Sequence, residues 1–343
     1  MINVGIAGWG LAGRSFHAPF LTEPFHIIAL VTSQDVKFAQ RLDSFDDLIA
    51  RDDIDLVVIA TPHFLHVEQA IAAMYAGKHV VVEKPVAASA EEVYRLQEVS
   101  TTTGLYCIPF QNRRWDGDFL TVKKLIEQDT LGRIYHFENR WNYYRPTIQD
   151  RWKSKAENMG GIFYDLAPHL IDQTLQLFGM PESIYAHMGI HHPKREVVDY
   201  FRLHLTYDTG MSALLEVDTF NAIEIPRFHI RGRWGTFDKY GVDPQEAMLR
   251  TGANPAHIED WGVEDEAHWG RIVGSTSEGE KHITAIPTER GDYGYFYRAV
   301  YKTLTDGSPP PVTLDEVYQQ LLVMNAAQQS SQTTSIVYME EVV

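Results

Sequence analysis

The sequence of 343 residues predicts a two-domain α/β protein, in which a parallel sheet covered by helices is followed by a large open, mainly antiparallel sheet. The length exceeds the roughly 250–300 residues at which a single hydrophobic core stops growing. Up to about residue 112, continuous apolar runs alternate with helical patterns, which is typical of parallel strands buried on both faces. Later segments alternate apolar and polar residues, which indicates strands with one face on helices. We therefore expect domains at 1–116 and 117–343, with the last helices able to pack back on the first domain.

Strands and helices take turns along the first domain. The expected strands are short apolar runs rich in β-branched residues, such as Val80 to Val82. The expected helices carry apolar residues at spacings of three and four. We expect strands at 2–7, 27–32, 55–60, 79–82 and 105–108, and helices at 12–22, 36–42, 45–50, 64–76 and 89–103.

The second domain shows a different pattern, with fewer helices and longer strands. Period-two alternation predicts strands around 201–207, 213–217 and 228–230. Residues 242–292 are rich in Gly, Pro, Asp and Glu with weak periodicity, and we expect them to be irregular. Helices are expected at 117–128, 162–178 and 293–304, and the segment 314–329 closes the chain.

Composition narrows the class of protein. The net charge of −16, from 46 acidic and 30 basic residues, opposes sequence-independent binding of nucleic acid. No apolar run of 18 residues exists, so we expect no membrane span, and a strand that begins at Ile2 leaves no room for a leader. A single cysteine, Cys107, excludes an intramolecular disulfide, and it falls in an expected buried strand. We expect a cytoplasmic protein that acts on small molecules.

A glycine-rich loop follows the first strand. Gly8, Gly10 and Gly13 match G-x-G-x-x-G, with Leu11 inside the motif, and the loop opens a helix within a β-α-β unit. In that context the glycines allow a tight turn and let a pyrophosphate approach the start of the helix. The pattern predicts a Rossmann dinucleotide-binding domain.

The end of the second expected strand bears on which dinucleotide is bound. NAD-binding domains place an acidic residue about 20 residues after the glycines, where it accepts a hydrogen bond from the ribose. Here Thr32 and Ser33 occupy that place, and a hydroxyl can donate to a 2′-phosphate that a carboxylate would repel. Lys37 and Arg41 could add positive charge. We expect NADP, with NAD as the alternative if Asp35 turns inward.

A second group of expected cofactor contacts follows the strands at 55–60 and 79–82, because ligands in such sheets lie outside the carboxyl ends of the strands. His63 and His66 could also suggest a metal pair, but no third ligand is evident and helix-end roles are favoured. The candidates are Thr61, Pro62, His63, His66, Glu83 and Lys84, with Asn112, Arg113 and Trp115 further along.

Lys84 follows a fully buried strand and precedes Pro85, which ends the strand. A lysine at a strand end usually extends its amine into solvent. Here it would lie where a nicotinamide is expected, and partial desolvation would suit it to proton relay or to donation toward a reacting oxygen. We consider a cis Lys84–Pro85 bond at this turn, which would fix the direction of the ammonium group.

Asp165 and His169 are four residues apart, so they share one face of the expected helix at 162–178. A solvated polar stripe is the plainer explanation of such a face. Removing hydride from a carbinol carbon requires loss of the hydroxyl proton, and a histidine suits that base near neutral pH. Asp165 would orient the imidazole or bind a neighbouring hydroxyl.

These motifs resemble the Gfo/Idh/MocA oxidoreductases along nearly the whole chain. The resemblance implies a Rossmann domain, a second α/β domain whose open sheet forms a homodimer or homotetramer, and reversible oxidation of a sugar or cyclic polyol. Gln111 to Asp116 and Tyr144 to Pro146 look most like the branch that contains NADP-dependent scyllo-inositol dehydrogenase, although Gln34 stands where that branch often has arginine. The motifs are Gly8 to Gly13, Ala60-Thr61-Pro62, Ala76 to His79, Glu83-Lys84-Pro85 and Gly160 to His169.

A polyol would need several polar and aromatic side chains around it. The expected catalytic residues are Lys84, Asp165 and His169. The expected substrate-binding residues are these three with Tyr144, Arg151 and Trp152, and Asn112, Arg113 and Trp115 are candidates for the same role.

Two other functions remain compatible with the sequence. One is a non-catalytic regulator that binds a dinucleotide or sugar. The other is an enzyme that keeps NAD(P) bound and uses it for an internal redox cycle. We expect no metal site, because His187, His191 and His192 have no cysteine or carboxylate at matching spacing.

Overall fold

The computed structural model describes residues 1–147, 160–275 and 280–342. The chain forms two compact units. Unit 1 comprises Met1–Asn112, Pro244–Trp261 and Asp292–Tyr318, and unit 2 comprises Arg113–Asp243, Gly262–Gly291 and Gln319–Val343. The sequence predicts one break near residue 116, whereas the units are discontinuous, because two later segments return to unit 1.

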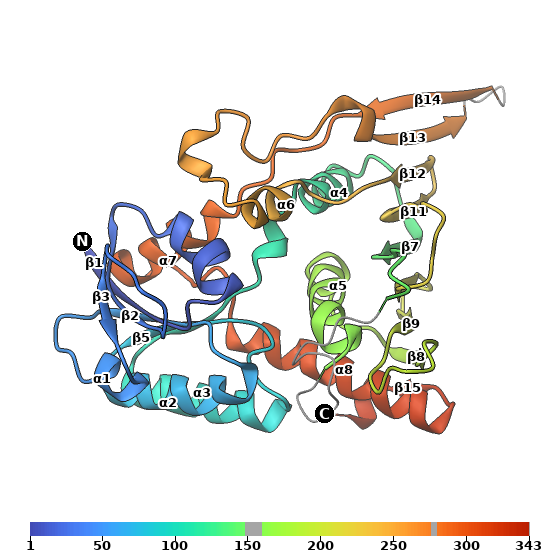
Figure 1. The fold of residues 1–343 in the computed structure, drawn as a ribbon. Helices are drawn as coiled ribbons and strands as arrows, with labels where there is room; N and C mark the ends of the chain where they lie inside the picture. The colour runs from blue at the N-terminus through green and yellow to red at the C-terminus, as the bar shows by residue number, and fades with distance from the viewer. Residues whose placement is uncertain (148–159, 276–279, 343) are drawn as a thin grey trace. The chain divides into compact units, whose positions relative to one another are not determined.

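Unit 1 is built on a six-stranded parallel sheet with the strand order β3-β2-β1-β4-β5-β6 (Figure 1). The strands β2 and β3 follow β1 on one side, and β4 begins a second series on the other side of β1. The carboxyl ends of β1 and β4 therefore form a topological switch point. Sheets of this kind bind ligands at such a point. The valines of β5 are fully buried, as expected for a strand covered on both faces. The strands are β1 (Ile2–Ala7), β2 (Phe25–Val31), β3 (Gln40–Leu42), β4 (Leu56–Ile59), β5 (His79–Val82) and β6 (Cys107–Pro109).

The helices of unit 1 largely follow the sequence pattern. Ser44 and Ser89 cap α1 and α3 by accepting hydrogen bonds from the backbone N–H groups of Asp47 and Glu92. The glycine-rich loop leads into a short π-helix, η1 (Ala12–His17), and a 3-10 turn, η2 (Ala18–Phe20), in place of one helix over 12–22. The other helices are η3 (His63–Leu65), α1 (Phe45–Ile49), α2 (His66–Tyr75), α3 (Ala90–Thr103), α6 (Gln245–Arg250) and α7 (Gly294–Asp306).

The helix expected at 36–42 is wrong. Residues 40–42 form β3, which pairs in parallel with Ala29 to Val31 at the edge of the sheet. Pairing with a neighbouring strand therefore outweighs a weak helical pattern over seven residues.

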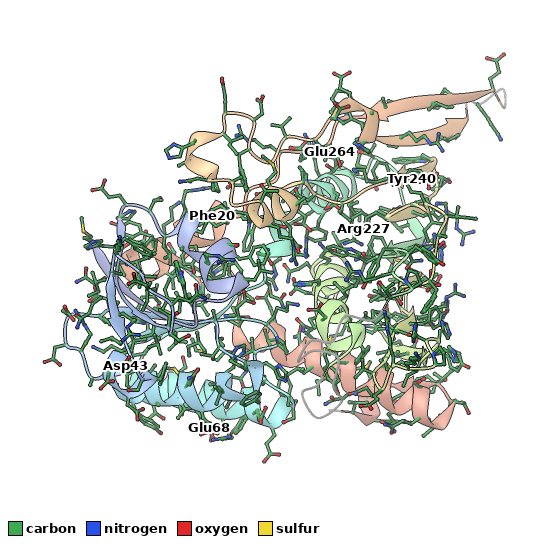
Figure 2. All side chains as sticks on the ribbon, in the orientation of Figure 1. Phe20, Asp43, Glu68, Arg227, Tyr240 and Glu264 are labelled. Carbon is green, nitrogen blue, oxygen red and sulfur yellow. The ribbon has the colours of Figure 1, made fainter. Side chains whose placement is uncertain are left out.

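Aromatic side chains explain why the late segments belong to unit 1. Phe20 of η2 is labelled in Figure 2. Its ring contacts those of Trp261 and Tyr293 edge-on, with ring centroids 6.2 and 6.4 Å apart. Phe110 contacts Phe296 of α7 at 4.8 Å. Such pairs bury large apolar areas, so α7 completes the core on which the first 112 residues depend.

Unit 2 is built on a nine-stranded sheet with the order β14-β13-β12-β11-β7-β10-β9-β8-β15 (Figure 1). The pair β7–β10 is parallel and the other neighbouring pairs are antiparallel, which confirms the expected mainly antiparallel sheet. The strands are β7 (Ile134–Arg140), β8 (Ser183–Gly189), β9 (Tyr200–Thr206), β10 (Ser212–Asp218), β11 (Phe228–Gly232), β12 (Thr236–Lys239), β13 (Gly270–Ser275), β14 (Lys281–Ile286) and β15 (Val337–Tyr338).

One face of this sheet is buried and the other is polar. Leu203, Leu205, Leu215 and Phe228 are fully buried, whereas Arg202 on the opposite face is exposed. The helices of unit 2 are α4 (Gly117–Glu127) and α5 (Ile162–Phe178), and α8 (Leu314–Thr333) begins in unit 1 and continues into unit 2. Across the described ranges, no helix combines the length and apolar character needed to cross a membrane.

The expectation that residues 242–292 are irregular is wrong in part. This stretch contains α6, two 3-10 turns (η7, Pro255–His257, and η8, Glu266–His268) and the hairpin of β13 and β14. Every residue of β14 except Ile286 is exposed, so its sequence lacks the alternation of a half-buried strand.

Candidate active site

The glycine-rich loop lies at the carboxyl end of β1, and its three glycines differ in what surrounds them. Gly8 has φ +98°, and a Cβ there would overlap the carbonyl oxygen of Ala60. A Cβ at Gly13 would overlap the carbonyl oxygen of Gly8. By contrast, a Cβ at Gly10 would meet no heavy atom of the described residues within 4 Å. Gly8 and Gly13 therefore close the turn, and Gly10 leaves open backbone that a phosphate group could approach.

The end of β2 presents hydroxyl groups beside this loop. The Thr32 hydroxyl accepts a hydrogen bond from the backbone N–H of Gln34 at 3.1 Å, and the Gln34 amide donates to the carbonyl of Trp9 at 3.3 Å. Ser33 is exposed between them. Arg41 lies on β3 and forms an ion pair with Asp43 at 3.3 Å, so it is not one helical turn beyond Lys37 as expected.

The turn after β4 is braced from within unit 1. The Thr61 hydroxyl lies 2.6 Å from Oε1 of Gln69 in α2. The His66 ring lies between two carbonyl oxygens, that of Pro85 at 2.8 Å from Nδ1 and that of Thr61 at 2.9 Å from Nε2. Burial lowers the pKa of His66 against the opposing effect of these contacts. His66 thus joins the turn after β4 to the turn after β5, and His63 beside it is also buried.

Glu83 and Lys84 leave the carboxyl end of β5. The Glu83 carboxylate accepts from the backbone N–H of Lys84 at 3.0 Å and lies 3.2 Å from Nε2 of His17. Burial would raise the pKa of Glu83, but His17 and the charges of Lys84 and His66 hold that pKa below its ordinary value. Glu83 is therefore a buried carboxylate beside Lys84. The Lys84–Pro85 peptide bond is cis, as considered from the sequence.

In unit 2, Asp165 and His169 lie on consecutive turns of α5. Gly161 precedes the helix with φ +93°, and a Cβ there would lie 2.8 Å from the carbonyl oxygen of Val198, so this glycine is required by packing. His169 is buried and Asp165 is half-buried. Lys84 belongs to unit 1, so the convergence of the three expected catalytic residues stays a prediction.

Tyr143 is a neighbour of Asp165 that no sequence motif singles out. Burial raises the pKa of the Tyr143 hydroxyl, the Arg145 charge opposes this, and the Asp165 charge raises it further. The expected substrate residue Tyr144 is instead 59% exposed and forms an isolated bridge with Phe220. The alternation of side chains along β7 is the signal that points to Tyr143. Asn139 of β7 faces α5, and Tyr143 lies an even number of residues after it, so continued alternation places both on the same side.

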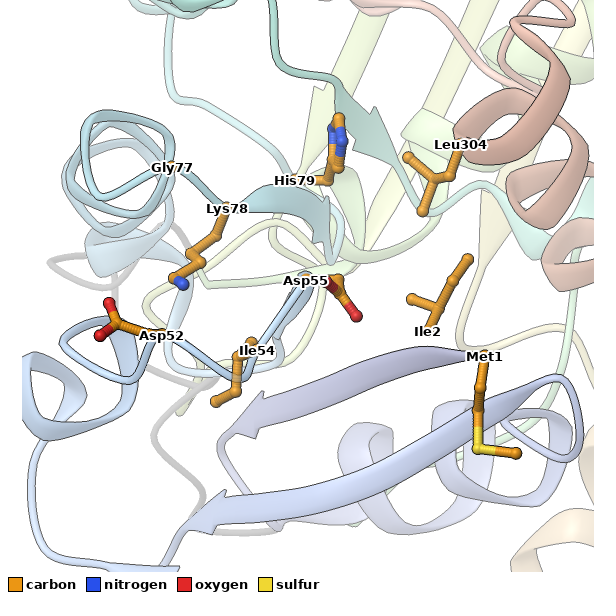
Figure 3. A pocket seen from close by; sticks show the side chains of 9 residues that line it. All are labelled: Met1, Ile2, Asp52, Ile54, Asp55, Gly77, Lys78, His79 and Leu304. Carbon is orange, nitrogen blue, oxygen red and sulfur yellow. The ribbon is translucent and has the colours of Figure 1, made fainter.

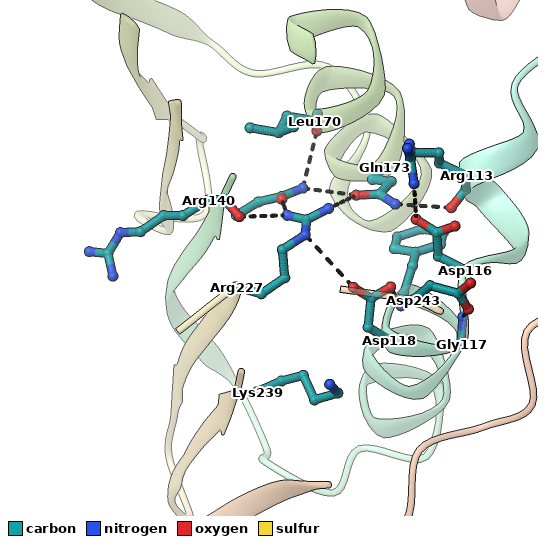
Figure 4. A network of polar contacts seen from close by, with 12 residues as sticks. Arg113, Asp116, Gly117, Asp118, Arg140, Leu170, Gln173, Arg227, Lys239 and Asp243 are labelled. Carbon is teal, nitrogen blue, oxygen red and sulfur yellow. Dashed lines mark hydrogen bonds and ion pairs between the residues drawn. The ribbon is translucent and has the colours of Figure 1, made fainter. Parts of the chain in front are cut away.

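The rest of the polar face of α5 is occupied by packing within unit 2. Arg114 binds Asp172, and Gln173 donates to the carbonyl of Arg113 at 3.0 Å. Gln173 Oε1 also accepts from Arg227 (Figure 4). The Arg227 guanidinium lies 4.8 Å from the Trp141 ring centroid. Asp172 and Gln173 are almost completely buried, so this part of the face is not the solvated stripe that a helical pattern suggests.

The segment Asn112–Trp115 forms the 3-10 turn η4, and its side chains are buried. The Arg113 guanidinium lies 4.2 Å from the Trp141 ring centroid and 3.3 Å from the Asp116 carboxylate. These contacts hold Arg113 within unit 2, and a role of Asn112, Arg113 and Trp115 in binding cofactor stays a prediction. The expected residues Arg151 and Trp152 lie outside the described residues.

A cavity of about 360 Å³ in unit 1 is a different feature (Figure 3). It is lined by residues at the amino ends of β1, β4 and β5, among them Ile2, Asp55 and His79. The glycine-rich loop and Lys84 lie at the carboxyl ends of the same strands, so this cavity is not the candidate active site.

Histidines and the cysteine have structural surroundings. His191 stacks on Tyr200 with centroids 4.9 Å apart, and its backbone N–H donates to Asp199. Within the described part of the chain, no group of three or more His, Cys, Asp or Glu side chains could hold a metal ion. Cys107 is buried in β6, and burial raises the pKa of its thiol to about 12.

The chain matches the models of one family over both of its halves. Residues 2–110 match the Gfo/Idh/MocA oxidoreductase family, NAD-binding Rossmann fold, and residues 123–339 match the C-terminal alpha/beta domain of that oxidoreductase family.

Individual relatives cover nearly the whole chain. The scyllo-inositol 2-dehydrogenase (NADP(+)) IolW of Bacillus subtilis (strain 168) is 37% identical over 348 residues, covering 99% of this chain and 96% of the relative. The oxidoreductase YdgJ of Escherichia coli (strain K12) is 34% identical over 93% of each chain. Among solved structures, yvaA from Bacillus subtilis superposes with a TM-score of 0.93 at 36% identity, over 98% of both chains. An oxidoreductase from Bacteroides fragilis gives 0.90 at 36% identity, over 98% of this chain and 99% of the other.

Proposed function

Because the chain belongs to the Gfo/Idh/MocA oxidoreductase family, we propose that it transfers a hydride between NADP(H) and a CH–OH group of a cyclic polyol or sugar resembling scyllo-inositol. One observation carries the proposal. The open backbone at Gly10 lies at the carboxyl end of β1, beside the switch point of the sheet, and Lys84 leaves the same edge from β5. The glycine-rich loop and a lysine that follows a buried carboxylate thus share one edge within unit 1.

The residues at the end of β2 fit a 2′-phosphate better than a ribose hydroxyl. Ser33 is exposed and can donate, and Gln34 brings no negative charge to this place. Asp35 is also exposed and could serve NAD instead. We propose NADP(H), which supplies or accepts the hydride when bound, as the cofactor.

The proposed chemistry assigns one task to each side chain. His169 takes the hydroxyl proton as the alcohol is oxidised, and returns it in the reverse direction. Lys84 donates a hydrogen bond to the same oxygen and stabilises the developing negative charge. Asp165 and Tyr143 bind a neighbouring hydroxyl of the substrate or orient the His169 ring. A base and a donor on one oxygen are what an alcohol oxidation requires.

The choice of substrate class is supported by likeness. The B. subtilis relative named for scyllo-inositol and NADP(+) aligns with nearly the whole chain at 37% identity. A polyol also suits the chemistry, because adjacent hydroxyls could use Asp165 and Tyr143 while His169 and Lys84 act on one carbon.

The test is a panel of inositols and aldoses, assayed for NADPH formation. We expect turnover of at least one cyclic polyol with NADP, and no turnover of any member with either nucleotide would refute the function. Lys84→Ala should retain NADPH binding and lower kcat by about 100-fold or more, as loss of a stabilising donor does. The matched control is Lys123→Ala on the exposed side of α4, which should keep the activity of the unaltered protein.

Cofactor choice has its own test. Ser33→Asp places a carboxylate where we propose the 2′-phosphate, so it should weaken NADPH binding more than NADH binding. Asp35→Asn serves as the comparison. If Asp35→Asn weakens NADH binding and Ser33→Asp leaves NADPH binding unchanged, NAD is the cofactor and Asp35 its ribose ligand.

We further propose that the polar face of the nine-stranded sheet joins copies of the chain in a homodimer or homotetramer. Tyr185 and His204 lie opposite each other on neighbouring strands of this face, and both are exposed. A double substitution, Tyr185→Glu with His204→Glu, should lower the mass measured by light scattering to that of the monomer.

A further inference from the structure

A buried chain of hydrogen bonds runs from α7 to the end of β5 in unit 1. The hydroxyl of Tyr297 lies 2.6 Å from Nδ1 of His17, and Nε2 of His17 lies 3.2 Å from Oε1 of Glu83. The other carboxylate oxygen of Glu83 accepts from the backbone N–H of Lys84 at 3.0 Å. Tyr297 and His17 are 1% and 0% exposed, so water does not compete for these contacts.

The protons in this chain can be placed from its chemistry. Burial, aided by the charge of Glu83, raises the pKa of Tyr297 well above its ordinary value, so the hydroxyl keeps its proton. His17 Nδ1 is the one acceptor within its reach among the described residues. With Tyr297 donating to Nδ1, the ring carries its proton on Nε2 and donates it to Glu83. Each polar atom of the chain then has a partner of the right kind.

The surroundings of His17 leave its ring little freedom. It packs against Phe110 with centroids 4.2 Å apart and edge-on to Tyr297 at 6.1 Å. The ring comes from the π-helix η1, directly after the glycine-rich loop. Single-turn π segments are frequent at functional sites, and here one turns a histidine inward toward the carboxylate.

We propose that Tyr297 and His17 are positioning residues, which fix the Glu83 carboxylate so that it holds Lys84 in the direction and charge state that alcohol oxidation needs. This inference rests on the proposed function of Lys84. Tyr297 and His17 would act on Lys84 through Glu83, and neither residue is among those expected from the sequence.

The charge of Glu83 explains how these residues would act on Lys84. The ionisable groups that act on Glu83 are His17 from η1, Lys84 next to it in the chain, and His66 from α2, with Tyr297 of α7 reaching it through His17. The charges of an ionised Glu83 and of Lys84 attract each other, and the burial of Glu83 weakens the screening of this attraction by water. If Glu83 became protonated, Lys84 would lose that partner.

Three variants separate positioning from simple packing. His17→Leu removes both hydrogen bonds of the ring, and His17→Gln keeps a donor that can still reach Glu83. Tyr297→Phe removes only the hydroxyl. The matched control is Tyr301→Phe, one turn further along α7, because Tyr301 also packs on Phe25, at 6.1 Å against 5.7 Å for Tyr297, and is not part of the chain.

The readout is the pH dependence of kcat/KM for the polyol that the panel identifies. Losing the hydrogen bond from His17 raises the pH below which Glu83 is protonated, so the acid limb of the profile should move to higher pH. At pH values below both acid limbs, where kcat/KM falls tenfold per pH unit, we expect His17→Leu to lie about tenfold further below its own maximum than the unaltered protein, because the limb moves by about one pH unit. His17→Gln should recover part of this loss, and Tyr297→Phe should show a smaller shift. Tyr301→Phe should match the unaltered protein.

Binding and stability measurements complete the test. NADPH affinity should be unchanged in all four variants. If the variants melt at lower temperature but keep the pH profile of the unaltered protein, the hydrogen bonds from Tyr297 to Glu83 only stabilise the fold, and the proposal is overturned.

A measurement without substrate distinguishes this inference from the proposed function. If no polyol is turned over, the proposed function has failed, and NMR then decides the inference. The ¹⁵N spectrum of His17 should show the proton on Nε2, and the ¹³C titration of the Glu83 carboxyl should move to higher pH in His17→Leu. A proton on Nδ1, or an unchanged carboxyl titration, would overturn the inference whatever the activity.

Discussion

Arg114 binds Asp172 through two hydrogen bonds, from Nε at 2.9 Å and from Nη2 at 2.6 Å, and both side chains are almost fully buried. The pair joins the turn before α4 to the middle of α5, the helix that carries Asp165 and His169. A two-pronged contact fixes the orientation of both groups. The position of α5 within unit 2 therefore depends on this pair.

Asp172→Asn should destabilise the protein by about 3 kcal/mol, because it leaves the Arg114 charge buried without its carboxylate. Chemical denaturation measures the loss. The control is Glu127→Gln, which removes the carboxylate of an exposed pair with Lys123 and should cost less than about 1 kcal/mol. Equal losses in the two variants would contradict the importance of the buried pair.

Tyr143→Phe should lower kcat/KM about tenfold, because it removes one hydroxyl beside Asp165 that we expect to bind substrate. Tyr144→Phe removes a hydroxyl from the neighbouring residue, which is exposed, and should leave kcat/KM unchanged. Steady-state kinetics of the two variants decide between them. A loss in Tyr144→Phe alone would restore the assignment made from sequence.

Two glycine substitutions should have opposite effects. Gly10→Ala has open space for its methyl group, so the protein should keep its melting temperature and lose nucleotide binding. Gly13→Ala would force its methyl group against the backbone of Gly8 and should cost about 1–3 kcal/mol of stability. Calorimetry and fluorescence titration of NADPH provide the two measurements. Unimpaired binding by Gly10→Ala would place the nucleotide elsewhere.

His79 should make stability depend on pH. Burial lowers its pKa against the charge of Asp55, and its Nδ1 accepts from the backbone N–H of Tyr106 at 3.1 Å. Protons therefore bind more readily to the unfolded chain, and stability is lost as the pH falls below the ordinary pKa of 6.5. His79→Asn keeps an acceptor without a titrating group. Its unfolding free energy should fall less between pH 7 and pH 5, and parallel curves would contradict this.

The parts of the fold that follow from sequence are those with a local cause. Continuous apolar runs such as Val80 to Val82 form buried parallel strands, and the glycine-rich loop is where the motif predicts it. The strand β3 pairs with residues of β2 that lie 11 positions earlier in the sequence, and the helical pattern at 36–42 gives no sign of this pairing. The exposed strand β14 has no pattern to detect.

The candidate site follows the same rule. Residues in motifs, such as Gly10, Lys84 and His169, are identified by spacing and family resemblance. His17 and Tyr297 are 280 positions apart, and no local pattern connects them. The spacing of Asp172 along α5 is that of a solvated polar face, but Asp172 is buried and accepts hydrogen bonds from Arg114, which precedes α4. The sequence does not show that Tyr144 is exposed and that Tyr143, next to it, is the more buried of the two, and the substrate role of each stays a prediction.

The return of α7 to unit 1 bears on how the protein is made. A nascent chain that has left the ribosome only as far as Asn112 lacks Phe296 and Tyr297, so Phe110 and Phe25 would remain uncovered. We therefore expect the core of unit 1 to be completed only after residue 318 has been synthesised, and the growing chain to expose apolar surface until then.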